Sequence, residues 1–207
     1  MVADQKWLEW AHEMRAIAQS GLTYTKDNFE RERFEWLKDL SDRVFAEYTD
    51  VDLAKVNDFY SNESGYCTPK VDVRAAVFFN NDILLVKEKV DGKWSLPGGW
   101  ADINLSPGEV AVKETLEESG FEVEPVKLLA VFDRRRHGHP PGPFYIYKII
   151  IQCQIIGGKP TPGNETLDVD FFKRDNLPEL SQGRTTPSQI QKLFQFLDDY
   201  HKQALFD

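Results

Sequence analysis

Hydrophobic side chains recur every three to four positions over the first sixty residues, and this spacing predicts helices. The first series runs over residues 7–18, and Gly21 is expected to end that helix because glycine favours a helix C-terminus. A second series covers residues 29–45, and a short third helix is expected over residues 51–60. The charged residues between the hydrophobic positions form the expected solvated faces.

The pattern changes after residue 65 to the continuous or alternating runs that are typical of strands. Residues 61–65 are rich in turn-forming side chains and predict a linker. Asn80, Asn81 and Asp82 separate two strand-like runs and predict a hairpin. The expected elements are strands over 71–79, 83–90, 123–133, 144–156 and 168–172, and helices over 106–119 and from Pro187 onward.

These elements predict an α/β (α+β) protein in which helices sandwich a mixed sheet and a helical extension precedes it. We expect a helical N-terminal extension over residues 1–64 and a main domain over residues 65–207. The extension holds more aromatic side chains than a small helical hairpin buries alone: Trp7, Trp10, Phe29, Phe34, Trp36 and Phe45. We therefore expect the extension to build a homodimer rather than to take part in catalysis.

Composition and charge narrow the choice of partner. The chain has 207 residues and a net charge of -9, so it has no bulk attraction for nucleic acid or for an anionic membrane. Its longest apolar run, residues 145–156, is interrupted by Lys148 and Gln152 and is too short to cross a bilayer. Cys67 and Cys153 lack the spacing of a metal site, and we expect two free thiols in a cytoplasmic protein.

The helix over residues 106–119 has strong end signals. Ser106 is a suitable N-cap, Glu109 completes a capping box, Pro107 fits the first turn and Gly120 fits the position after the end. Glu114, Glu117 and Glu118 then follow the i, i+3, i+4 spacing that places three carboxylates on one face. Such a face is either solvated or a site for a hard cation such as Mg²⁺ or Mn²⁺, which prefers oxygen ligands.

The residues around this helix resemble the Nudix box, which runs glycine, five residues, Glu, seven residues, then Arg-Glu-apolar-any-Glu-Glu-any-Gly-apolar. The residues in register with it are Gly99, Glu114, Glu117, Glu118, Gly120 and Phe121. The resemblance implies a Nudix fold over about residues 70–175. It also implies that Glu114, Glu117, Glu118 and the Gly99 carbonyl hold Mg²⁺ or Mn²⁺.

Three positions depart from the box. Leu105 replaces the upstream Glu, Lys113 replaces the Arg, and Thr115 replaces an apolar residue. In the family the missing Glu and Arg commonly pair, so their joint replacement removes the pair as a unit. Lys113 is expected to pair with Glu109 one turn earlier instead.

The N-terminal segment around Trp7, Trp10 and residues 17–24 resembles the helical extension of a bacterial Nudix subgroup. That subgroup acts on nucleoside diphosphates linked to another group X, with ADP-ribose and CDP-choline as typical substrates, and its members are typically dimers. The resemblance implies that this chain hydrolyses the pyrophosphate bond of such a compound, giving a nucleoside monophosphate and a phosphorylated X.

Pyrophosphate cleavage needs charge neutralisation, an oriented water and a base. The base is either a box acid, Glu117 or Glu118 among them, or Glu165, because related enzymes often place a catalytic Glu in the corresponding loop. Lys87 and Arg74 are candidates for binding phosphate, as is the basic cluster that contains Arg134 and Arg136, although each is also consistent with a surface cation. The aromatic residues on which a base could stack are Trp94, Trp100, Phe144 and Tyr147.

Other functions remain open at this stage. The same chemistry could act on RNA 5′ ends or short RNA, although the acidic chain offers no long basic track. A nucleotide-sensing regulator without catalysis is disfavoured because all three box carboxylates are present. Residues 1–60 could also bind another protein. A zinc site at His137 and His139 is disfavoured because no third ligand accompanies them.

Overall fold

The computed structural model describes residues 6–207, and the chain divides into two compact units. The N-terminal unit comprises the chain up to Pro69 together with Pro141–Tyr145. The sheet unit comprises Lys70–Pro140 and Ile146–Asp207. None of the described helices combines the length and the apolar character needed to cross a bilayer. Cys67 and Cys153 do not form a disulfide with each other.

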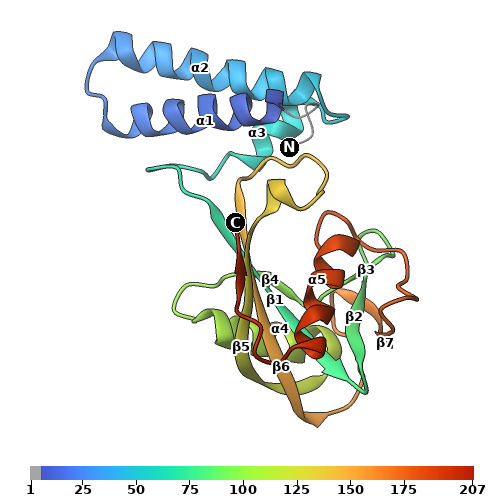
Figure 1. The fold of residues 1–207 in the computed structure, drawn as a ribbon. Coiled ribbons are helices and arrows are strands. Elements are labelled where there is room, and N and C mark those ends of the chain that lie inside the picture. The colour runs from blue at the N-terminus through green and yellow to red at the C-terminus, as the bar shows by residue number, and fades with distance from the viewer. Residues whose placement is uncertain (1–5) are drawn as a thin grey trace. The chain divides into compact units, whose positions relative to one another are not determined.

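The N-terminal unit is built on two long antiparallel helices, α1 (Lys6–Tyr24) and α2 (Asn28–Glu47), followed by the short α3 (Leu53–Phe59) (Figure 1). Its small core consists of Leu8, Phe45, Val56 and Tyr60. The chain re-enters this unit at residues 141–145, where the Tyr60 hydroxyl donates a hydrogen bond to the Pro143 carbonyl. The unit is therefore helical, as its hydrophobic spacing predicted.

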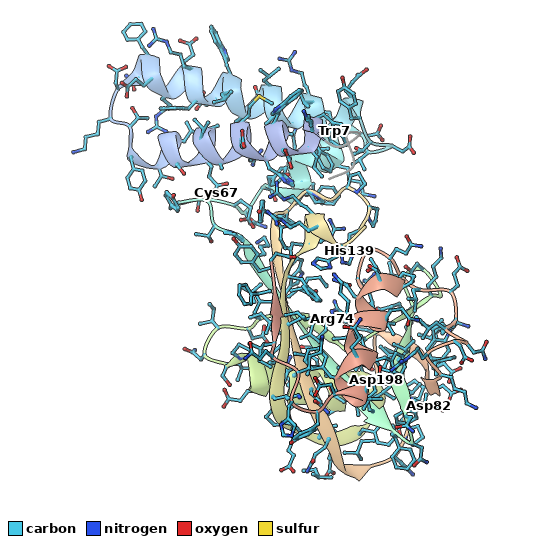
Figure 2. The ribbon with its side chains drawn as sticks, in the orientation of Figure 1. Trp7, Cys67, Arg74, Asp82, His139 and Asp198 are labelled. Carbon is cyan, nitrogen blue, oxygen red and sulfur yellow. The ribbon has the colours of Figure 1, made fainter. Side chains whose placement is uncertain are left out.

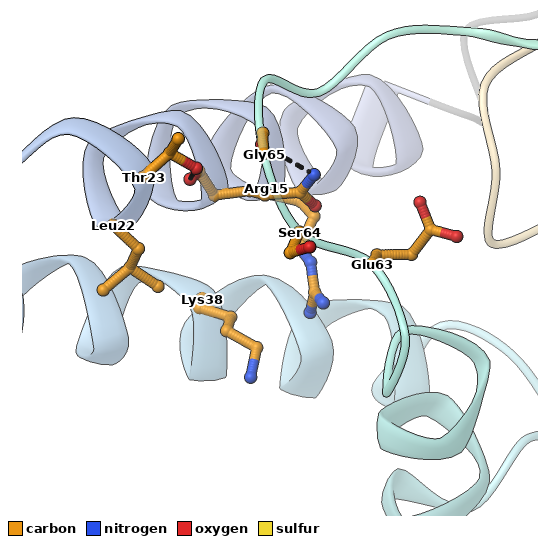
Figure 3. A pocket seen from close by; sticks show the side chains of 8 residues that line it. Arg15, Leu22, Thr23, Lys38, Glu63, Ser64 and Gly65 are labelled. Atoms are coloured by element: carbon orange, nitrogen blue, oxygen red, sulfur yellow. Dashed lines mark hydrogen bonds between the residues drawn. The ribbon is translucent and has the colours of Figure 1, made fainter.

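A buried ion pair joins the two long helices. The Arg15 guanidinium donates to both carboxylate oxygens of Asp42, at 2.6 and 2.8 Å, and also lies over the Tyr60 ring. Both side chains of the pair are almost fully buried. Figure 3 shows a neighbouring pocket of about 400 Å³, in which a hydrogen bond links the Gln19 amide to the Gly65 carbonyl.

The prediction that Gly21 ends the first helix is wrong, because α1 continues to Tyr24. A Cβ at Gly21 would overlap the aromatic ring of Phe34 on α2. Gly21 therefore lies inside α1 and does not end it. Its lack of a side chain allows α1 and α2 to pack closely together.

We expect Gly21→Ala to destabilise the N-terminal unit. The overlap with Phe34 costs about 1–3 kcal/mol, which outweighs the roughly 1 kcal/mol that alanine gains over glycine in a helix. In a Phe34→Ala background, the same substitution should instead stabilise the unit by about 1 kcal/mol. Hydrogen exchange of α1 and α2 amides would measure both changes, and equal effects in the two backgrounds would contradict the packing explanation.

The sheet unit contains a mixed sheet with the order β3-β2-β1-β6-β5-β8, in which β4 pairs with β1 and β7 with β2. The central pair, β1 and β6, is parallel, and β5 runs antiparallel to β6. The strands are β1 (Lys70–Phe79), β2 (Asp82–Glu88), β3 (Trp94–Ser95), β4 (Gly98–Trp100), β5 (Phe121–Asp133), β6 (Ile146–Gly158), β7 (Thr166–Phe172) and β8 (Leu205–Phe206). The expected strands are all present, with ends displaced by about two residues.

Two helices cover the two faces of this sheet. Helix α5 (Pro187–Asp198) contributes Ile190, Leu193 and Phe194 to one core, and α4 (Pro107–Ser119) contributes Val110 and Ala111 to the other. The sheet is therefore sandwiched between helices, as the sequence predicted (Figure 1).

The local turn and cap predictions are confirmed. Asn80 and Asn81 both adopt positive φ, 50° and 67°, between the antiparallel strands β1 and β2. Ser106 and Glu109 form the capping box of α4, and Gly120 ends the helix in the left-handed conformation. The helix that carries the box carboxylates is thus fixed at both ends.

Candidate functional site

A cavity of about 520 Å³ lies beside the C-terminal half of α4. Residues of α4 and of the loop before β7 line it: Lys113, Glu114, Glu117, Glu118, Gly163, Asn164 and Glu165. The three carboxylates that the sequence placed on one helix face therefore share one cavity with Glu165, a residue 47 positions beyond the last of them.

Glu118 is the deepest of these carboxylates, with 7% of the residue exposed. Its Oε2 accepts a hydrogen bond of 2.8 Å from the Gly98 amide, so it also holds the loop that begins the box. Burial raises the pKa of Glu118 to about 7, although the nearby Arg74 cation and the Gly98 amide act in the opposite direction. A positive charge placed in this cavity would favour the ionised carboxylate.

Glycines bring the box loop close to its neighbours. Gly98 has a φ of 142°, and a Cβ there would overlap the backbone of β1 at Val73. A Cβ at Gly99 would lie 3.2 Å from Oε2 of Glu114, which places the Gly99 backbone beside that carboxylate. The loop backbone is therefore near the acidic face of α4, as a ligand role for the Gly99 carbonyl requires.

Lys113 occupies the acidic cluster rather than pairing with Glu109, so that prediction is wrong. Its Nζ lies 3.0 Å from Glu114, 3.2 Å from Asp102 and 3.3 Å from Glu117. Hydrogen bonds to Glu114, and then to Asp102, raise the pKa of Lys113. Glu109 is already engaged, because its carboxylate accepts bonds from the Ser106 amide and hydroxyl.

The donor set suits a hard divalent cation. The cavity is lined by carboxylate oxygens, the ligand type that Mg²⁺ and Mn²⁺ prefer, and the Lys113 ammonium already places one positive charge among them. Within residues 6–207, no three His, Cys, Asp or Glu side chains converge closely enough to enclose an ion, because Glu114 and Glu117 turn toward Lys113. Rotation of the Glu114 and Glu117 side chains away from Lys113 would give the oxygen ligands that such a cation needs.

The loop that carries Glu165 packs directly on the last turn of α4. A Cβ at Gly163 would overlap the Glu117 carbonyl oxygen, so only glycine fits there. The Thr166 hydroxyl donates to the Glu118 carbonyl and accepts from the Gly163 amide, both at 2.7 Å. These contacts hold Glu165 at the edge of the cavity.

Two other candidates are engaged within the protein. Arg74 lies buried in the sheet unit (Figure 2) and donates to both oxygens of Asp72 and to the Leu96 carbonyl. Its backbone also lies against Gly98 of the box loop. The Trp94 ring packs edge-on against Phe172 in the core, with centroids 4.7 Å apart. These positions favour support of the loop and of the core over the direct ligand contact that we predicted.

The remaining cations differ in exposure. Lys87 lies half-buried on β2, opposite Asp168 of β7. Arg134 and Arg136 belong to the single turn η2 (Arg134–Arg136), where Arg134 is buried and Arg136 is exposed. The two histidines are used separately: His137 binds the Asp207 carboxylate, and His139 binds the Gln182 carbonyl.

Sequence reasoning missed Asp72 and Lys148, two buried polar residues of the sheet unit. Lys148 gave a signal, because it is a lone lysine in the apolar run that became β6. A lysine inside a buried strand predicts a buried acidic partner. Its Nζ lies 2.6 Å from Asp72 on β1.

Comparison with known proteins places the sequence in a family. Residues 5–60 match a model described as a UDP-X-like, N-terminal oligomerisation domain, and residues 69–194 match the NUDIX domain. The chain belongs to the Nudix hydrolase family. It is 51% identical over 202 residues to YjhB of Bacillus subtilis (strain 168), which is provisionally named an ADP-ribose pyrophosphatase, and the match covers 98% of this chain and 97% of that one.

Solved structures give the same family. A crystal structure of a UDP-X diphosphatase is 34% identical, with a TM-score of 0.63, over 99% of both chains. An ADP-ribose pyrophosphatase from Streptococcus suis 89-1591 is 39% identical, with a TM-score of 0.62, and the match covers 68% of this chain and 100% of that one. This Nudix hydrolase therefore has relatives that share both of its units.

Proposed function

We propose that this Nudix hydrolase cleaves the pyrophosphate bond of a nucleoside diphosphate linked to a group X, of the ADP-ribose or CDP-choline type. The observation that carries the proposal is the single cavity in which Glu114, Glu117 and Glu118 meet Glu165. The names of the relatives support the same substrate class, because two are ADP-ribose pyrophosphatases by name and one is a UDP-X diphosphatase.

In the proposed reaction, water attacks one phosphorus of the diphosphate as the bond from that phosphorus to the bridging oxygen breaks. Glu114, Glu117, Glu118 and the Gly99 carbonyl would hold Mg²⁺ or Mn²⁺, and the ion would supply positive charge against the phosphate oxygens. Glu165, or a box carboxylate such as Glu117 or Glu118, removes the proton from the attacking water. The Gly98 amide keeps Glu118 oriented, and the Gly163 contact keeps Glu165 at the cavity.

A substrate panel tests the proposal. ADP-ribose, CDP-choline, sugar nucleotides and RNA with a 5′-triphosphate should be assayed with Mg²⁺ and with Mn²⁺. We expect kcat/KM for at least one nucleoside diphosphate-X compound to exceed that for RNA, and activity to vanish in chelator. A tenfold preference for RNA, which is about 1.4 kcal/mol of transition-state stabilisation, would instead favour the RNA 5′-end alternative.

We also propose that the N-terminal unit forms a homodimer. Trp10, Ile17 and Tyr24 recur every seven residues along α1 and are exposed. Phe29, Trp36 and Leu40 form a similar exposed series on α2. Exposed apolar stripes of this kind are characteristic of helix–helix interfaces, and the matching family model describes an oligomerisation domain.

We expect Trp36→Glu to shift the full chain from dimer to monomer, because a carboxylate would have to be desolvated at the interface. Sedimentation equilibrium at micromolar concentration measures the change. Val90→Glu is a matched control, since Val90 is equally apolar and exposed but belongs to the sheet unit. A wild-type chain that sediments as a monomer would rule out the dimer.

A further inference from the structure

A group of buried polar side chains lies on the α5 side of the sheet, and we name it the Asp72 cluster. Its members are Asp72, Arg74, Arg134, His139 and Lys148. Asp72 of β1 pairs in register with Lys148 of β6, which pairs in turn with Phe132 of β5. Arg134 follows two residues after Phe132. Alternation along the strands places Asp72, Arg74 and Lys148 on one face of the sheet. Arg134 in the turn after β5 and His139 in the following loop lie close enough for the charges of this group to affect their pKa values.

Asp72 already has its full set of partners. Its carboxylate accepts hydrogen bonds from Arg74 Nε at 3.0 Å, from Arg74 Nη2 at 2.9 Å and from Lys148 Nζ at 2.6 Å. Burial alone would raise the pKa of Asp72, but the Arg74 and Lys148 cations lower it. One carboxylate therefore balances two cations and has little capacity left for a third.

That third cation is Arg134, of which only 8% is exposed. In the described part of the chain, its guanidinium makes no hydrogen bond and lies within 4 Å of no carboxylate. Burial lowers the pKa of Arg134, and Asp72 compensates only in part. Burial removes most of the hydration of this guanidinium, but none of its nitrogens is fully enclosed, so an anion can still reach it and replace the lost water.

His139 adds a hydrogen-bond acceptor without a donor to the Asp72 cluster. Its Nδ1 donates to the Gln182 carbonyl at 2.6 Å, so in the neutral ring Nε2 carries a lone pair. Nε2 is buried and has no hydrogen-bond partner among the described residues. Burial lowers the pKa of His139 to about 3, and the cations of Lys148 and Arg134 act in the same direction. The ring therefore stays neutral and needs a donor such as a hydroxyl.

The nearest other acids do not balance Arg134. The charges of Glu118 and Glu88 raise the pKa of Arg74, not that of Arg134. Glu88 also pairs with Arg184 at 3.1 Å and accepts a hydrogen bond from the Ser95 hydroxyl at 2.5 Å. Burial also lowers the pKa of Lys148 to about 8, a shift to which Arg74 and Arg134 contribute. The cluster as a whole therefore holds more positive than negative charge.

We propose that the Asp72 cluster is a binding site for a phosphate ester that carries a neighbouring sugar hydroxyl, with Arg134 and Lys148 binding the phosphate and His139 Nε2 accepting from the hydroxyl. This proposal rests on the proposed function for the identity of the ligand, because either half of a nucleoside diphosphate-X substrate can contain a phosphate next to a sugar hydroxyl. A choline group, which is cationic and has no sugar hydroxyl, is disfavoured beside Arg134.

Calorimetric titration of the full chain without divalent cation tests the site with four probes: ribose 5-phosphate, AMP, phosphocholine and inorganic phosphate. We expect ribose 5-phosphate or AMP to bind at least tenfold more tightly than phosphocholine and inorganic phosphate. The tighter of the two sugar phosphates identifies which half of the substrate the cluster holds. Equal affinities for all four probes, or no binding of any, would overturn the proposal.

Variants separate binding from structural support. Arg134→Met should weaken the sugar phosphate at least tenfold, and Arg134→Lys should restore part of the affinity. The ligand-free Arg134→Met protein should melt at the wild-type temperature or above, because the unpaired charge is gone, whereas a structural arginine would lower Tm when removed. Arg174→Met is the matched control, since Arg174 is an exposed arginine paired with Asp198 in the same unit.

The two proposals fail in different ways. An inactive substrate panel would remove the proposed hydrolysis but leave the metal-free titration unaffected. Wild-type affinity in Arg134→Met would remove the Asp72 cluster as a ligand site and leave the hydrolysis standing.

Discussion

Glu118→Gln is expected to lower kcat by about 10²-fold or more, which is the scale of losing a major electrostatic contribution in an active site. The amide oxygen of glutamine can still accept the hydrogen bond from Gly98 that Glu118 accepts at 2.8 Å. The substitution therefore removes the negative charge with little change in shape. Steady-state kinetics on the best compound of the substrate panel, with saturating Mg²⁺ or Mn²⁺, measure the loss.

Glu109→Gln is a suitable control on the same helix. Glutamine also completes a capping box, so the start of α4 is retained, and Glu109 does not line the cavity. We expect this variant to keep kcat within about twofold of wild type. Activity of Glu118→Gln at the wild-type level, or full activity of a Gln triple variant at positions 114, 117 and 118, would refute the assignment of the acidic face.

Arg15→Met should destabilise the N-terminal unit by about 3–5 kcal/mol, the cost of leaving one member of a buried ion pair without its partner. Asp42 would then keep a buried carboxylate with no cation at 2.6 Å. Burial already raises the pKa of Asp42 against the opposing effect of Arg15, so losing the arginine removes the main compensation. Hydrogen exchange of α1 and α2 amides reports this unit directly.

The double variant Arg15→Met, Asp42→Leu decides between charge and packing. If the cost comes from the stranded carboxylate, removing it should recover most of the lost stability, because a buried pair is often replaced by apolar residues without loss. A double variant as unstable as Arg15→Met alone would show that packing of the Arg15 side chain over Tyr60 is what matters. We do not expect these variants to change the hydrolysis rate, because the catalytic residues lie in the sheet unit and the Arg15–Asp42 pair lies in the N-terminal unit.

Features governed by neighbouring residues could be predicted from the sequence. The capping box of α4 and the positive φ angles at Asn80 and Asn81 depend on side chains within a few positions. The i, i+3, i+4 spacing of the three carboxylates likewise places them on one face wherever the helix packs. The box resemblance added the identity of the fold, and it extended the prediction to Glu165.

Features governed by distant residues could not be predicted in this way. Gly21 matched a helix stop until Phe34, thirteen positions later, supplied the reason for a glycine inside α1. The sequence left Arg74 as either a phosphate ligand or a surface cation, because it does not show that β1 is buried at this point or that the distant Leu96 carbonyl accepts from Arg74. Lys113 was assigned to Glu109 from helical spacing, but Asp102 from the preceding loop competes successfully.

The parallel pairing of β1 with β6 sets the order in which the chain can fold during synthesis. Asp72 cannot pair with Lys148 until the ribosome has added the 76 residues that separate them. At about 5–20 residues per second, that synthesis takes roughly 4–15 s. Until then β1 pairs with β2 only near the Asn80 turn, at Phe78 and Phe79, so its apolar centre has no partner on the β6 side. The hairpin of α1 and α2 needs no such wait. We therefore expect the newly made sheet unit to keep apolar strand surface uncovered for several seconds, a state in which a chain is prone to aggregation.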